Sequence, residues 1–304
     1  MSPTPTSAAV EAILSEIAEE RSDGATSLAL RGLDALETLS DDLPQERRAA
    51  LDRITALAGR IDALRPSLAA IGVQAVLALA RTQALVAQGM GPSFALRQAI
   101  RVERETLGQA NATISSLARR ELGAGGVLVS CSWSVTAARC LVAINPERVL
   151  VAEGHRLGDG LRCAKWLAAR GLEVEVVPDG ALPTSVGDAR AVIVGADQVL
   201  ADGSVVNRCN TFPLALAANH FGVPFYVACQ RIKLGGRTSA PIEESPGLFG
   251  VLPEGVTSRV PLFDVTPTTL VRGVITESGL LSPGEAGEIG SRIAELRQRY
   301  LSIE

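Results

Sequence analysis

The sequence predicts an α/β protein with a helical N-terminal domain over residues 1–122 and an α/β domain with a mainly parallel sheet over residues 123–304. Three observations predict this. Apolar residues recur at helical spacing up to about Arg120, a glycine cluster follows at positions 123–126, and short β-branched runs then alternate with helical stretches. Such alternation is typical of βαβ units and a parallel sheet. A length of 304 residues also fits two domains.

The N-terminal region predicts several helices. Leu51, Ile54, Leu57, Ile61 and Leu64 follow the spacing of one apolar helix face. Turn-forming residues predict breaks at 41–44, 65–66 and 89–92. The region therefore reads as a helical bundle or cap.

The second half predicts five strands and two marked helix starts. The strand candidates are Val127–Ser130, Val149–Ala152, Val174–Val177, Ala191–Val194 and Phe225–Ala228. One helix start is predicted where Thr266 precedes Pro267. The other is a capping box from Ser282 to Glu285 with proline at the first helical position, which predicts a last helix over Pro283–Leu301.

Composition excludes several classes of protein. A formal net charge of -4 argues against a nucleic-acid partner, because non-specific binding needs basic patches. The apolar runs are shorter than the ~20 residues of a membrane span, and the N-terminus lacks the pattern of a signal peptide. Five cysteines without C-x-x-C spacing indicate reduced thiols, and the two histidines have no metal-ligand spacing. We therefore expect a cytoplasmic protein without a membrane partner or a metal site.

Ligands of open parallel sheets bind beyond the carboxyl ends of the strands. The residues that come after four of the predicted strands include Cys131, Glu153, Asp197 and Gln230. Asp197 either caps the following turn or points into a cleft. Cys131 either has its pKa lowered by the start of the next helix or is an ordinary small buried residue. Position alone leaves both alternatives open.

A longer motif makes the prediction specific. The stretch VIVGADQVLADGSVVNRCNT from Val192 resembles the GAD-x-x-x-x-x-G-x-x-x-N-K-x-G-T pattern of a family with two branches. One branch contains aldose–ketose isomerases of ribose-1-phosphate-type sugars, namely methylthioribose-1-phosphate isomerase and ribose-1,5-bisphosphate isomerase. The other contains the regulatory subunits of translation initiation factor 2B. The segments FDVTP from Phe263 and VITESG from Val274 also match, and the resemblance covers about residues 125–280.

The resemblance implies a Rossmann-like α/β domain and a set of site residues. Its catalytic pair corresponds to Cys131 and Asp197, and it requires no metal or organic cofactor. An acid must protonate the ring oxygen of such a sugar, and hydrogen must then move from C2 to C1, so a thiol and a carboxylate could divide these tasks. The substrate-binding residues that it implies are Arg21, Gly24, Ala25, Arg65, Ser132, Asn207 and Arg208. For Arg21, a plain surface arginine is an equal alternative.

This chain departs from the family pattern near the implied site. Ser130 stands where the family has histidine, and Ser132 and Trp133 stand where it has asparagine and serine. His155 replaces an arginine, and Asn210 replaces the glycine of N-K-x-G-T. These changes indicate either a different substrate or a weakened catalytic role.

The resulting hypothesis is an aldose–ketose isomerase that converts a ribose 1,5-bisphosphate-like sugar to its ribulose bisphosphate-like ketose. The alternative is a non-catalytic, sugar-phosphate- or nucleotide-binding regulatory protein of the initiation factor 2B type. A purely structural interaction protein is disfavoured because the implied pocket residues are present. The resemblance also implies a homodimer, with a hexamer as a further possibility.

Overall fold

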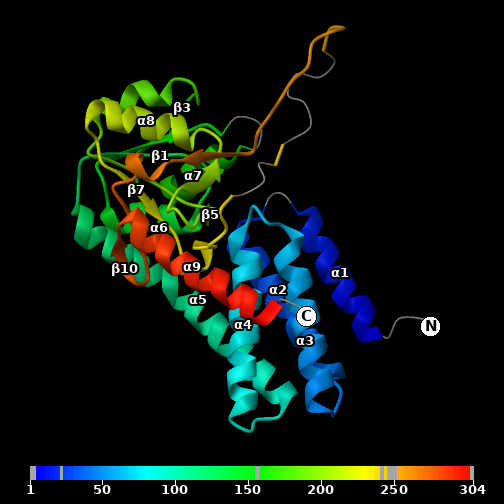
Figure 1. Ribbon diagram of the computed structural model, residues 1–304. Coiled ribbons are helices and arrows are strands. Elements are labelled where there is room, and N and C mark those ends of the chain that lie inside the picture. The colour runs from blue at the N-terminus through cyan, green and yellow to red at the C-terminus, as the bar shows by residue number, and fades with distance from the viewer. Residues whose placement is uncertain (1–4, 21–22, 155–157, 240–242, 245–251, 302–304) are drawn as a thin grey trace.

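A computed structural model describes residues 5–20, 23–154, 158–239, 243–244 and 252–301 of the chain. It has a helical N-terminal part and an α/β part with a mainly parallel sheet, which confirms the predicted fold class (Figure 1). The blue and cyan helices of the N-terminal part lie beside the green and yellow α/β part, and the red last helix crosses between them.

The N-terminal part contains five α-helices among the described residues. They are α1 (Pro5–Glu19), α2 (Ala25–Leu39), α3 (Arg47–Leu64), α4 (Ala69–Ala87) and α5 (Pro92–Leu122). The predicted breaks lie between these helices, with a short 3-10 helix at Ser40–Asp42. The proline at the first position of α5 explains its start, because the missing N–H would have no partner inside the helix.

Helix α4 is apolar enough, over its 19 residues, to cross a membrane by length and composition. From the sequence, we expected no apolar segment as long as a membrane span. In the fold, 67% of its most apolar window is buried, and it packs against α2, α3 and α5. Its apolar surface on all sides therefore matches a central core helix of the bundle.

The main sheet has seven strands in the order β10-β9-β7-β4-β1-β2-β3. All of its pairs are parallel except the β9–β10 pair at one edge. The strands are β1 (Val127–Ser130), β2 (Arg148–Ala152), β3 (Val174–Val177), β4 (Ala191–Val194), β7 (Phe225–Ala228), β9 (Gly273–Thr276) and β10 (Gly279–Leu281). The five predicted strands are thus confirmed, whereas β9 and β10 were not predicted.

Alternating side chains of the strands pack on opposite faces of this sheet. Leu128 and Ile193 belong to a core formed with α5, α6 (Val135–Ile144) and α7 (Asp159–Ala168). Val129 and Val194 belong to a second core, formed with α8 (Thr211–Phe221) on the other face. The C-terminal half of α5 is part of the first core, so the sheet shares a core with helical residues before position 123.

A second, antiparallel sheet was also not predicted. It consists of β5 (Gln198–Val199), β6 (Val205–Arg208) and β8 (Phe263–Thr266), in that order. The helix expected after Thr266 is wrong, because β8 ends there and only the 3-10 turn Thr268–Leu270 follows. The last helix is confirmed as α9 (Pro283–Leu301), with the Glu285 carboxylate accepting from Ser282 as predicted for a capping box. Helix α9 packs back on α3 and α4.

Candidate functional site

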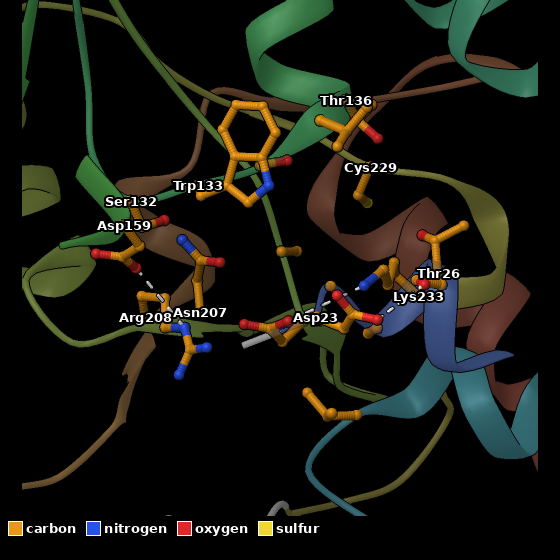
Figure 2. Close-up of a pocket in the computed structure, with 18 of the residues that line it drawn as sticks. Asp23, Thr26, Ser132, Trp133, Thr136, Asp159, Asn207, Arg208, Cys229 and Lys233 are labelled. Atoms are coloured by element: carbon orange, nitrogen blue, oxygen red, sulfur yellow. Dashed lines mark hydrogen bonds and ion pairs between the residues drawn. The ribbon is translucent and has the colours of Figure 1, made fainter. Parts of the chain in front are cut away.

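A cavity of about 540 Å³ lies where the carboxyl ends of β1, β4 and β7 meet the start of α2 (Figure 2). This is the position expected for a ligand of a parallel sheet. Seven of the nine implied site residues line it: Gly24, Ala25, Arg65, Ser132, Asp197, Asn207 and Arg208. Of the other two, Cys131 is not among the lining residues, and Arg21 lies outside the described residues.

One side of the cavity carries Asp197 and Lys233. Asp197 follows β4, and its Oδ1 lies 4.0 Å from the Nζ of Lys233, which follows β7. Lys233 is only 7% exposed. Burial lowers the pKa of the Lys233 ammonium, and the carboxylate of Asp197 opposes that effect. A cation and a carboxylate therefore face the same space with little water around them.

Asn207, Arg208 and Asp159 also line the cavity and are grouped together in Figure 2. Asn207 and Arg208 end β6, and the guanidinium of Arg208 lies over the ring of Phe263 at 5.0 Å. The Nε of Arg208 is 3.9 Å from Oδ2 of Asp159, the first residue of α7. Burial raises the pKa of Asp159, and the charge of Arg208 opposes this.

The N-terminal part closes the cavity with the start of α2 and with Arg65. Gly24 is the N-cap of α2 and Ala25 is its first residue, and no side chain of the described residues caps the helix. An uncapped helix start offers N–H donors and a partial positive charge to an anion. Arg65, after α3, donates to the carbonyl of Glu20 at 2.6 Å and forms an ion pair with Glu243 at 2.9 Å. Glu243 also accepts from Ser67.

Cys131 is not among the residues that line this cavity, but it is linked to one of them, Asn207, through the hydroxyl of Thr211. The Cys131 side chain is 2% exposed and packs in the core beneath α8, on the same face as Val129. Its sulfur is 3.5 Å from Oγ1 of Thr211. That hydroxyl donates to the carbonyl of Arg208 at 2.7 Å, so the thiol must be the donor to it. Burial raises the pKa of Cys131 to about 12, and Asp264, Asp159 and Asp179 add to this rise.

The residue after Cys131 turns the chain into the cavity. Ser132 has a φ of 61°, which L-residues rarely adopt, and it lines the cavity together with Trp133. Trp133 is held by an edge contact with Trp166, with ring centroids 5.7 Å apart, and by Arg162, 4.9 Å from its ring. The two tryptophans of the chain thus pack together, and Trp133 contributes an aromatic ring to the cavity wall.

Asn210 explains one of the departures from the family pattern. It has a φ of 92° at the N-cap of α8, a conformation that glycine and asparagine tolerate best. Its side chain donates to the carbonyl of Asp179 at 3.3 Å. The backbone geometry of the motif is therefore compatible with this change. His155 lies outside the described residues.

Sequence reasoning missed Lys233, Asp159 and Thr26. Lys233 is one of only two lysines, and it follows a predicted strand by five residues, which was a usable signal. Asp159 begins a helix after the second strand. Thr26 donates to Gln230 at 2.8 Å and so joins α2 to the end of β7. No local pattern indicates that last contact, because it connects residues 204 positions apart.

Among the described residues, no group of three or more His, Cys, Asp or Glu side chains could hold a metal ion. Three carboxylates, those of Asp23, Asp159 and Asp197, instead line one cavity, and each has a cation within 4.0 Å. Such a site can bind an anionic ligand and move protons on it.

Comparisons with known proteins were made at three levels. Residues 21–283 match the family described as the initiation factor 2 subunit family. A translation initiation factor eIF-2B subunit 2-like protein of Pyrococcus furiosus is 31% identical over 278 residues, which cover 89% of this chain and 95% of the relative. A methylthioribose-1-phosphate isomerase of Gemmatimonas aurantiaca is 32% identical over 294 residues, covering 87% and 85%.

Two solved structures are also similar to this chain. Translation initiation factor eIF-2B of Pyrococcus horikoshii OT3 aligns with a TM-score of 0.77 at 28% identity, over 91% of this chain and 98% of that chain. A chain of the tetrameric eIF2B-β2-δ2 complex of Chaetomium thermophilum aligns with a TM-score of 0.74 over 95% of both chains. Its 18% identity shows a shared fold alone.

Proposed function

Because the chain belongs to the initiation factor 2 subunit family, whose relatives include sugar-phosphate isomerases, we propose that it is an aldose–ketose isomerase of a ribose-1-phosphate-type sugar. The observation that carries this is the cavity itself, in which seven implied site residues from both parts of the chain meet. A ribose 1,5-bisphosphate-like substrate is the form we propose.

In this proposal, different residues bind the two phosphate groups of the substrate. We place the 1-phosphate at Arg208, whose guanidinium can grip two phosphate oxygens. Asn207 is held beside it, because its amide donates to Thr211 at 2.9 Å. The second phosphate fits the uncapped start of α2 at Gly24 and Ala25, next to Arg65.

Asp197 is the proton-transfer group that we assign to the C2 side of the sugar. Its carboxylate faces the cavity beside Lys233, whose ammonium can stabilise negative charge on an oxygen at C2. The resemblance pairs Asp197 with Cys131, and this pairing stays a prediction. Cys131 lies behind Asn207 and Arg208 and is joined to both through the hydroxyl of Thr211.

The test is to incubate the purified protein with ribose 1,5-bisphosphate, 5-methylthioribose 1-phosphate and ribose 1-phosphate, and to follow the ketone carbon by ¹³C NMR. We expect turnover of a sugar 1-phosphate and its loss in Asp197→Asn, with substrate still raising the melting temperature of the variant. Asp202→Asn, a carboxylate of the β5–β6 turn that caps Ser204, is the matched control that keeps turnover. Unimpaired turnover in Asp197→Asn would refute the assignment.

A second candidate is a regulatory protein that binds a phosphorylated ligand without converting it. The position of Cys131 outside the cavity favours it, since one implied catalytic group is missing from the wall. This candidate predicts that sugar phosphates or nucleotides stabilise the protein against heat while no ketose forms at any enzyme concentration.

For the assembly we propose a homodimer, which rests on the family resemblance alone. Static light scattering should then give twice the 31.7 kDa mass of the chain, and a monomeric mass over the micromolar range would contradict it.

A further inference from the structure

The thiol of Cys131 and the amide of Asn207 share one hydroxyl group, that of Thr211, the first residue of α8. Cys131 directly follows β1, and Asn207 lies on β6 and lines the cavity. The hydroxyl of Thr211 therefore joins the predicted acid of the reaction to a residue of the cavity wall. This reasoning rests on the proposed function, in which Cys131 is paired with Asp197.

Every hydrogen-bonding position of the Thr211 hydroxyl is used. A hydroxyl has one proton to donate and two lone pairs that accept. The proton goes to the carbonyl oxygen of Arg208 at 2.7 Å, because a carbonyl can only accept. One lone pair accepts from Nδ2 of Asn207 at 2.9 Å. The other lies 3.5 Å from the sulfur of Cys131 and so accepts the S–H.

The bond to Thr211 decides which atom of Asn207 meets a ligand. Because the Thr211 proton is given to Arg208, the amide atom beside Thr211 must be the donor, Nδ2. Asn207 is 3% exposed, and among the described residues none donates to its Oδ1. That oxygen is therefore left to accept a hydrogen bond from a hydroxyl group of the sugar.

The same hydroxyl suits both protonation states of Cys131. Burial raises the pKa of Cys131 to about 12, and the hydrogen bond with Thr211 opposes this rise. While the thiol is protonated, Thr211 accepts its S–H and fixes the proton. Once the proton is lost, the hydroxyl can rotate away from the carbonyl of Arg208 and donate to the thiolate, because a hydroxyl both accepts and donates.

We propose that Thr211 is a positioning residue of the reaction, whose hydroxyl holds the proton of Cys131 before transfer, stabilises the thiolate after it, and fixes Asn207 as an acceptor for a sugar hydroxyl.

The proton transfer that Thr211 supports balances without any further reactant. The thiol proton passes to the ring oxygen as the C1–O bond breaks, and the electron pair of that bond stays on the oxygen. One hydrogen then moves from C2 to C1, and the C2 hydroxyl loses its proton as the C2 carbonyl forms. That proton replaces the one that Cys131 gave, so the ketose phosphate has the composition of the aldose phosphate.

The test compares two substitutions of Thr211 in the full chain, with the substrate that the wild-type protein turns over. Thr211→Val keeps the shape of the side chain and removes the hydroxyl, whereas Thr211→Ser keeps the hydroxyl and removes the methyl group. We expect Thr211→Val to lower kcat by about 10- to 100-fold, the effect of losing one hydrogen bond to a charged group. KM should rise by less than kcat falls, and Thr211→Ser should keep kcat within about threefold.

Urea unfolding of the same proteins separates positioning from support of the fold. Both substitutions remove part of a fully buried side chain, so both should lower the free energy of unfolding, and only Thr211→Val should lower kcat. The matched control is Thr82→Val. Thr82 is also 0% exposed, and its hydroxyl donates to the carbonyl of Ala78 at 2.7 Å within α4, outside the cavity lining. This control should keep both kcat and KM.

The outcomes are distinct. Full kcat in Thr211→Val, or an equal loss of kcat in Thr211→Val and Thr211→Ser, overturns this inference and leaves the proposed function standing. A wild-type protein that turns over none of the sugar phosphates overturns the proposed function, and this inference with it.

Discussion

The carboxylate of Asp264 accepts a hydrogen bond from the first turn of α8. It lies on β8, and its Oδ2 accepts the N–H of Phe212 at 3.0 Å. Among the described residues its buried Oδ1 has no hydrogen-bond partner. Burial raises the pKa of Asp264 to about 6, although the N–H groups of Phe212, Asn210 and Thr211 oppose this. The folded protein therefore binds the proton of this group more tightly than the unfolded chain does.

This shift predicts how stability changes with pH. Between pH ~4 and ~6 the folded state holds more protons than the unfolded state, so the contribution of Asp264 is present below pH 4 and is lost as pH rises. In Asp264→Asn, which keeps an acceptor for Phe212 but no charge, this loss of about 3 kcal/mol should disappear. Urea unfolding of both proteins at pH 4 to 8 measures the difference.

The control is Asp52→Asn, which changes an exposed carboxylate of α3. Its free energy of unfolding should change with pH in the same way as that of the wild-type protein. The assignment fails if Asp264→Asn also runs parallel to it.

Asn210, the N-cap of α8, allows the cost of a positive φ at the same helix start to be measured. Its φ of 92° costs a residue with a Cβ about 1 to 2 kcal/mol unless the side chain compensates. We expect Asn210→Ala to lower the free energy of unfolding by about that amount and Asn210→Gly to lower it by less, since glycine has no steric penalty. Denaturant midpoints of the two variants decide this, and an equal loss in both would mean that the hydrogen bond to Asp179 is the larger contribution.

The helices α3 and α4 approach closely at Gly72. A Cβ at this position would lie 2.9 Å from the Cα of Asp62, which is backbone and cannot rotate away. Gly72→Ala should therefore separate the two helices and destabilise the protein by about 1 to 3 kcal/mol. Gly108→Ala in α5, where a Cβ would meet nothing within 4 Å, should be neutral or stabilising by up to about 1 kcal/mol. Thermal unfolding of the pair checks this, and equal melting temperatures would contradict the close approach.

Asp62 also joins the two parts of the molecule. Its carboxylate binds Arg237, which follows the 3-10 turn Arg231–Lys233, at 3.0 Å, and Arg297 on α9 at 2.8 Å. Burial lowers the pKa of Arg297, and the charge of Asp62 opposes this lowering, so the carboxylate offsets part of the desolvation of this cation. Removing Asp62 leaves partly buried guanidinium groups without their partner.

Asp62→Ala should lower the free energy of unfolding by about 3 kcal/mol. Both tryptophans lie in the α/β part, so their fluorescence reports that part, whereas far-UV circular dichroism reports helices throughout the chain. The two urea curves should coincide for the wild-type protein and separate in Asp62→Ala. Glu11→Ala, which removes an exposed ion pair with Arg60, is the control and should change stability by less than about 1 kcal/mol. Coincident curves in Asp62→Ala would show that other contacts couple the two parts.

Local patterns in the chain were enough to determine the helices and strands of the main layers. The run Val174–Val177 is a strand and Pro283–Leu301 is a helix, as predicted, because burial periodicity and capping act over a few residues. The small sheet and β9 were not predictable in this way. Their pairing depends on partners such as β6 and β8, which are far apart in the chain.

The motifs by themselves determined which residues gather around the cavity: Asp197 follows β4 at the carboxyl edge of the parallel sheet, and Asn207 and Arg208 end β6, whose Val206 carbonyl accepts the N–H of Asp197. Only the tertiary structure decided which chemical groups face it. Cys131 continues the alternation of Val127 and Val129 and so points under α8, while Asp159 and Lys233 enter the wall. The physical reason is that alternation assigns a side chain to a face of the sheet, but both faces are covered by helices, and only their packing determines which positions are buried and which line the cavity.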